Sequence, residues 1–143
     1  MTKPYTTPIS IIKVDDGDVL HALKSNEDSF SKFGEAYFSN VKSGKIKAWK
    51  MHKKMTLNIV VPVGEIKFVL FKDAKEFSGE TDFEEFFLSR SNYKRLTVPP
   101  NFWMGFQCKS EEDAMLLNIA DIEHDPAEVK NMEINEIDYN WGN

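Results

Sequence analysis

The chain has 143 residues, of which 41% are hydrophobic and 29% charged, and its formal net charge is −5. This composition is typical of one soluble globular domain, and the negative charge argues against a general nucleic-acid-binding protein. No apolar run approaches the ~18 residues of a membrane-spanning helix, and no secretory signal opens the chain. We expect a single cytoplasmic domain over residues 1–143 with no membrane partner. Cys108, the one cysteine, excludes an intrachain disulfide.

The first half of the chain alternates between short β-prone runs and turn residues. The predicted elements are an extended arm (1–8), a short strand (9–14), a turn (15–18), a helical turn or strand (19–23), a loop (24–32) and a strand (35–41). Segment 44–71 then holds a run that ends at His52 and two β-rich runs, 57–61 and 65–71. A short Pro-Val-Gly turn separates the last two, so we expect them to be antiparallel neighbours in one sheet.

The second half continues the same pattern. The predicted elements are a charged connection (72–82), a weak strand (83–88), a turn (89–93), a run (95–98) that leads into a rigid Pro-Pro-Asn corner (99–101), an aromatic run (102–106), a polar hairpin loop (109–113), a buried strand (114–119) and a helix-like stretch (127–132). Many short strands without a long amphipathic helix predict an all-β protein. The number of strands favours a double-sheet jelly roll, here with a short C-terminal helical segment.

His52 is the first candidate for chemistry. It shares strand parity with Ile46 and Ala48, so a regular strand would turn it to the interior side of the sheet. An imidazole titrates near neutrality and can act as a general base, and small-molecule sites commonly lie in the mouths of β-barrels. The alternative is a histidine that is simply satisfied in the core or on the surface.

The basic residues are unevenly distributed. Segment 36–64 contains six lysines and no acid. These lysines either form a solvated strand face or line an anion site, for example for a phosphate. Within and beyond this segment, the cations that we predict to bind the anionic part of a substrate are Lys50, Lys53, Arg90 and Arg95.

Aromatic and neighbouring residues complete the predicted substrate-binding set. Trp49 and Phe102 either belong to the core or form a wall on which a sugar or base ring stacks. Asn58 and Met104 are the other predicted members of this set.

The three histidines, His21, His52 and His124, are scattered along the chain without metal-ligand spacing. The sequence therefore predicts no bound metal and no cofactor.

Four pieces of the sequence occur in an order typical of one family. They are GKIKAWKMH (44–52), VGEI (63–66), Leu88-Ser89 with Asn92, and VPPNFWMGF (98–106). Together they resemble the dTDP-4-dehydrorhamnose 3,5-epimerase family of the cupin superfamily over residues 35–121. The resemblance implies a cupin jelly roll, a homodimer, no metal and a nucleotide-sugar substrate inside the barrel.

The resemblance also implies roles for single residues. His52 matches the family's catalytic base, and the aspartate that orients this base is either Asp121 or Asp138. The chain departs from the family pattern elsewhere: the acid tyrosine falls at Leu117, the lysine near the substrate carbonyl at Leu57, an arginine at Trp49 and a histidine at Met104.

The function predicted from these residues is epimerisation of a dTDP-linked or similar 4-keto-deoxysugar, by proton abstraction next to the keto group, in surface polysaccharide biosynthesis. The departures from the family pattern keep two alternatives open. One is a non-catalytic cupin that binds a sugar or nucleotide sugar. The other is a related ketoisomerase, which also moves protons but uses a different acid.

Overall fold

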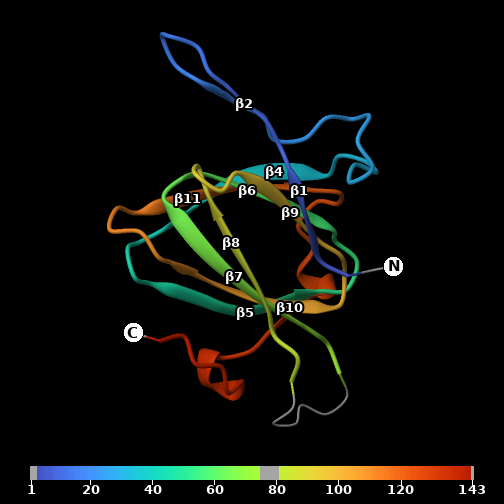
Figure 1. Ribbon diagram of the computed structural model, residues 1–143. Helices are drawn as coiled ribbons and strands as arrows, with labels where there is room; N and C mark the ends of the chain where they lie inside the picture. The colour runs from blue at the N-terminus through green and yellow to red at the C-terminus, as the bar shows by residue number, and fades with distance from the viewer. Residues whose placement is uncertain (1–2, 75–80, 143) are drawn as a thin grey trace.

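The computed structural model describes residues 3–74 and 81–142, and in this part of the chain two five-stranded antiparallel sheets face each other (Figure 1). The first sheet has the order β1 (Tyr5–Pro8), β9 (Lys94–Val98), β6 (Leu57–Val63), β11 (Ala114–Ala120), β4 (Glu35–Val41). The second has the order β12 (Val129–Asn131), β5 (Ile46–His52), β10 (Phe102–Cys108), β7 (Glu65–Lys72), β8 (Glu84–Ser89). This architecture confirms the predicted all-β jelly roll.

Two short strands, β2 (Ile11–Ile12) and β3 (Val19–Leu20), form a hairpin that extends away from the two sheets (Figure 1). The segment 19–23, for which the sequence left a helical turn or a strand open, therefore begins as a strand. No helix in the described ranges is long and apolar enough to cross a membrane.

The main core lies between the two sheets. Alternation on β11 places Ala114, Leu116 and Ala120 in it, as expected where one strand face is buried. Phe68 and Leu70 of β7 meet them from the second sheet, with their side chains fully buried.

A second apolar cluster covers the opposite face of the second sheet. Trp49 and Met51 of β5, Phe71 of β7 and Trp103 of β10 belong to it. We call this group, with the residues packed on it, the outer cluster. The C-terminal segment closes it with Ile137, Trp141 and the half-buried Tyr139. Figure 1 shows this segment beneath the sheet that contains β5 and β10.

One predicted strand pairing is wrong. β6 hydrogen-bonds to β9 and β11 in the first sheet, whereas β7 pairs with β10 and β8 in the second. The turn between them therefore carries the chain from one sheet to the other. Gly64 makes this crossing possible, because its φ is +77° and a Cβ at this position would lie 2.7 Å from the Ala114 Cβ.

In place of the predicted C-terminal helical segment, the structure has short 3₁₀ turns and a strand. Two single turns of 3₁₀ helix, η1 (Pro126–Glu128) and η2 (Ile134–Glu136), flank the strand β12. Pro126 begins η1, and Asp125 caps it by accepting from the amide of Ala127 at 3.0 Å. Residues 129–131 then pair with the free edge of β5, which satisfies backbone groups that a helix would leave exposed at that edge.

Candidate functional site

A histidine and a carboxylate form a close pair at the end of β5. The Nδ1 atom of His52 lies 2.5 Å from Oε1 of Glu128. The Glu128 side chain is only 2% exposed, and its Oε2 accepts from the amides of Lys54 (2.9 Å) and Met55 (3.2 Å). Because a carboxylate accepts, this contact assigns the proton of a neutral His52 to Nδ1. Nε2 is then left with a lone pair that can take a proton.

The hydrogen bonds around Glu128 decide its charge. Burial by itself raises the pKa of this carboxyl, but the bonds from His52 and from the two amides outweigh it and hold the pKa below its ordinary value of 4.5. Glu128 is therefore ionised at neutral pH. An ionised carboxylate at Nδ1 stabilises the imidazolium that forms when Nε2 takes a proton.

The side of β5 on which His52 lies follows from its neighbour. Met51 belongs to the outer cluster, so His52, the next residue of the strand, points to the side of the sheet that faces the first sheet. The sequence pattern put Ile46 and Ala48 on the same side of the sheet as His52, but both residues contact the outer cluster on the other side. The pairing of β5 with β10 shifts between Lys47 and Lys50, where β5 has one extra residue, and this breaks the alternation on β5.

A pocket of about 400 Å³ opens between β4 and β5. We call it the β4–β5 pocket. Its lining combines Lys47 and Lys50 with Tyr37, Ser39, Ala48, Trp49, Met104, Phe106 and Asn131. Lys47 Nζ donates to Ser39 Oγ (3.2 Å) and to the carbonyl of Asn40 (2.8 Å), which fixes one cation at the wall. Two cations beside apolar and aromatic side chains suit a ligand with both an anionic and a ring part.

Several predicted site residues meet in or next to this pocket. Lys50, Met104 and Trp49 line it. His52 follows Lys50 by two residues on the same side of β5, which is roughly 7 Å along a strand. Phe102, in contrast, is 7% exposed and belongs to the core between the sheets.

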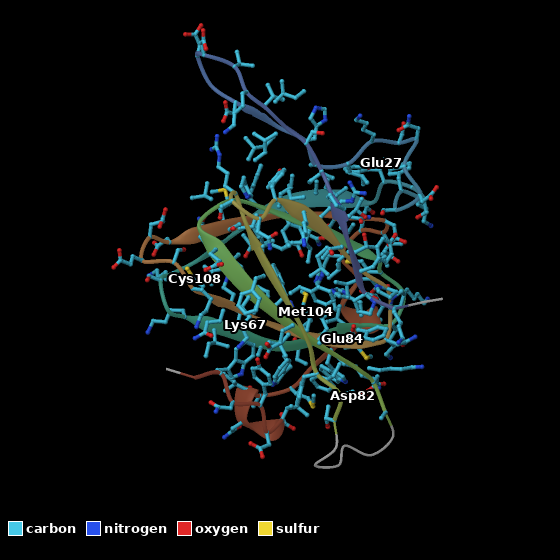
Figure 2. The ribbon with its side chains drawn as sticks, in the orientation of Figure 1. Glu27, Lys67, Asp82, Glu84, Met104 and Cys108 are labelled. Carbon is cyan, nitrogen blue, oxygen red and sulfur yellow. The ribbon has the colours of Figure 1, made fainter. Side chains whose placement is uncertain are left out.

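Two other predicted residues lie on the opposite side of the first sheet. Arg95 is 1% exposed and donates to the Glu27 carboxylate (3.3 Å) and to the carbonyl of Ala22 (2.8 Å). Asn58 donates to the carbonyl of Ser29 at 3.1 Å. Both side chains hold the segment after β3 against the sheet, so the prediction that they bind substrate is corrected. Figure 2 shows Glu27 in this segment, far from Met104.

The remaining predicted cations lie at the surface. Arg90 is exposed and pairs with Asp18 at 3.0 Å. Lys53 is exposed just after β5, and its backbone amide donates to the carbonyl of Glu128 at 2.8 Å. Neither residue is among those that line the β4–β5 pocket.

The carboxylate beside His52 is neither of the two that the sequence suggested. Asp121 accepts from the amide of Thr56 at 2.8 Å and so fixes the turn before β6. Asp138 is exposed in the segment that covers the outer cluster. Glu128 was missed because it lies in an acidic stretch with helix-like composition. The signal that could have found it is the β-prone Val129 that follows, which begins the strand paired with β5.

Within the described ranges, no group of three or more His, Cys, Asp or Glu side chains is arranged to hold a metal ion.

No family model matches the chain. A dTDP sugar isomerase from Desulfovibrio desulfuricans G20 is 33% identical, with a TM-score of 0.89 over 96% of this chain and 90% of the other. A dTDP-4-dehydrorhamnose 3,5-epimerase from Sulfolobus tokodaii is 21% identical, with a TM-score of 0.75 over 91% and 77%. A probable low-salt glycan biosynthesis epimerase from Haloferax volcanii is 23% identical over 104 residues, which is 71% of this chain and 67% of the relative.

Proposed function

Because this chain belongs to the dTDP-4-dehydrorhamnose 3,5-epimerase family, as a divergent member, we propose that it isomerises a dTDP-linked or similar 4-keto-deoxysugar. The reaction is epimerisation at a carbon next to the keto group, within the biosynthesis of a surface polysaccharide. The observation that carries the proposal is the buried His52–Glu128 pair beside a cationic pocket.

His52 is the base in this proposal. Its Nε2 takes the proton from the carbon next to the keto group, and the electron pair of the broken C–H bond moves into an enolate. Glu128 stays ionised and stabilises the imidazolium, because its carboxylate accepts the Nδ1 proton. A protein that only binds a sugar has no use for an imidazole oriented in this way, so the pair favours an enzyme over a binding protein.

Lys47 and Lys50 hold the diphosphate of the nucleotide. Both line the β4–β5 pocket, and they lie on the same strand as His52. Lys47 is at the end of the pocket where it bonds Ser39, whereas Lys50 lies between Lys47 and His52. We therefore propose that the diphosphate binds toward Lys47 and the sugar toward His52. Met104 and Phe106 supply apolar walls for the rings, whereas the Trp49 ring is buried in the outer cluster and is not the stacking wall that the sequence suggested.

A ketoisomerase is the second candidate, because the name of the 33% identical dTDP sugar isomerase fits either reaction. The two reactions begin with the same proton abstraction but differ in product, because a ketoisomerase also moves the carbonyl to a neighbouring carbon.

One experiment tests the proposal. The protein is incubated in heavy water with a panel of dTDP-linked 4-keto-deoxysugars, and NMR follows deuterium at each carbon together with the product. We expect exchange at a carbon next to the keto group, with epimerisation there; carbonyl migration identifies the ketoisomerase instead. Binding of the panel with no exchange at any carbon contradicts the enzymatic proposal.

We further propose that the protein acts as a cytoplasmic homodimer. The family resemblance implies the dimer, and large apolar side chains that are exposed in the single chain support it. Ile12 and Val19 on the protruding hairpin are 48% and 50% exposed, and Phe33 and Phe38 near β4 are both 64% exposed. The buried, unpaired Cys108 fits a reducing compartment. Light scattering at micromolar concentration tests the dimer, and a monomer mass contradicts it.

A further inference from the structure

An epimerisation needs a second proton-transfer group, and the β4–β5 pocket, which lies next to His52 along β5, contains one on the first sheet. If the base removes a proton from one face of a carbon, inversion requires that a proton is delivered to the other face. His52 belongs to the second sheet, and the two sheets face each other. A donor for the opposite face therefore has to come from the first sheet.

Tyr37 of β4 is in that position. It lines the β4–β5 pocket from the first sheet, together with Ser39. Its side chain is 44% exposed, so the phenol is accessible to a ligand. Ser39 is a poorer donor, because its hydroxyl accepts from Lys47 and an alcohol is a much weaker acid than a phenol. Lys50 lies on the same strand as His52 and would reach the sugar from the side of the base.

A buried amide holds the hydroxyl of Tyr37 in place. Asn118 of β11 is the register partner of Tyr37 and of Ile59, whose side chain is in the core between the sheets. It is 2% exposed, and its Nδ2 donates to the Tyr37 hydroxyl at 3.1 Å. This contact uses a lone pair of the hydroxyl and leaves the phenolic proton free to be donated. The same N–H stabilises the phenolate after the proton has left.

The neighbouring residue Leu117 shows why the sequence did not point to this phenol. The family resemblance places the acid tyrosine at Leu117, but Leu117 pairs with Phe38 and Val60, and Phe38 is 64% exposed. Leu117 therefore lies on the outer face of the first sheet. Asn118 is the inward residue, and the phenol next to it comes from a different strand.

We propose that Tyr37 is the catalytic proton donor to the sugar face opposite His52, and that Asn118 is its positioning residue; this rests on the proposed epimerisation. His52 Nε2 takes the proton from the carbon, and the C–H electron pair moves into the enolate. The electron pair then returns to the same carbon and forms a new C–H bond with the proton of Tyr37. The phenolate takes a proton from water, and the imidazolium of His52 returns its proton to water. The configuration is inverted, and nothing is oxidised or reduced.

The test separates abstraction from delivery. In heavy water with the dTDP-linked 4-keto-deoxysugar that the wild-type protein epimerises, Tyr37→Phe removes only the hydroxyl. We expect this variant to exchange deuterium at the carbon within a few-fold of the wild-type rate, since His52 is intact. Formation of the epimer should fall on the order of 10²- to 10⁴-fold. Tyr5→Phe is the matched control, because Tyr5 is 43% exposed on β1 and bonds Ser29 outside the pocket.

Epimerisation by Tyr37→Phe at the wild-type rate overturns the inference. An equal loss of exchange and epimerisation in this variant, with Tyr5→Phe unaffected, also overturns it, because the hydroxyl then acts in binding or abstraction. Carbonyl migration without inversion in the wild type removes the need for a second donor and overturns it as well. If the wild type exchanges no deuterium with any substrate, the proposed function itself fails.

Discussion

Neighbouring side chains on β10 point to opposite faces of the same sheet and meet different surroundings. Trp103 lies in the outer cluster, is 4% exposed, and donates its indole N–H to Asp73 at 2.8 Å. Met104, the next residue, is half-buried and lines the β4–β5 pocket. β5 repeats the contrast, with Met51 in the outer cluster and His52 bonded to Glu128. The C-terminal segment covers one face of the sheet, whereas the β4–β5 pocket opens on the other face. Substitutions on the two faces should therefore affect stability and chemistry separately.

The largest expected effect is on the outer face. Trp103→Ala removes a large buried ring and leaves Asp73 without its partner. The free energy of unfolding should fall by about 3–5 kcal/mol, measured by urea denaturation. Met104→Ala is the matched variant on the pocket face, and we expect a smaller loss of stability together with weaker dTDP binding. If Trp103→Ala weakens dTDP binding of the folded protein as much as Met104→Ala does, the two faces of the sheet do not act separately.

Glu128→Gln tests how far the carboxylate contributes to the base. The side chain keeps its size, but the charge that stabilises the imidazolium is lost. We expect the rate of deuterium exchange to fall on the order of 10²-fold, with little change in substrate affinity. Asp121→Asn is the control, because Asp121 bonds Thr56 and not His52. A larger loss of exchange in Asp121→Asn than in Glu128→Gln would return the role to Asp121.

Lys50→Ala tests the anion-binding wall of the pocket. Charge-assisted hydrogen bonds contribute roughly 1.5–3 kcal/mol, so dTDP should bind about 10- to 100-fold more weakly by calorimetry. Lys45→Ala is the matched control, since Lys45 is exposed just before β5 and does not line the pocket. Equal effects of the two substitutions would mean that the lysines act only through the general field of the surface.

The smallest expected effect is on the pH dependence of stability. The pKa of Glu128 is lower in the folded chain than its ordinary value of 4.5, so its interactions stabilise the fold fully above this value. That contribution is lost as the pH falls through the folded pKa. In urea denaturation, the difference in unfolding free energy between the wild type and Glu128→Gln should shrink as the pH falls below about 4.5, where the Glu128 carboxylate takes up a proton. A difference that grows over this acid range would contradict the assigned sign.

The sequence predicted the fold well because strand alternation and turn residues are local signals. The strand 35–41 was predicted with the bounds that β4 has, and the jelly roll followed from the number of strands and turns. The pairing of β6 with β7 was wrong because a Pro/Gly turn looks the same whether the chain folds back within a sheet or crosses to another one.

The site was predicted less completely, since it depends on contacts between distant segments. Arg95 and Lys50 are both cations near apolar residues in the sequence, yet Arg95 is buried against Glu27 and Lys50 lines the pocket. Glu128 lies 76 positions from His52, and no local pattern marks it as the partner. Tyr37 stands out only once Asn118 is seen next to it on β11.

The most direct test of the account is proton abstraction by His52. Wild-type protein and His52→Ala are compared in heavy water with the dTDP-linked 4-keto-deoxysugar that the wild type turns over, and NMR measures the rate of deuterium incorporation next to the keto group. Circular dichroism and dTDP binding confirm that the variant is folded. Loss of the base should slow exchange on the order of 10²- to 10⁴-fold while dTDP still binds. Exchange at the wild-type rate in His52→Ala would remove this histidine from the reaction and contradict the account.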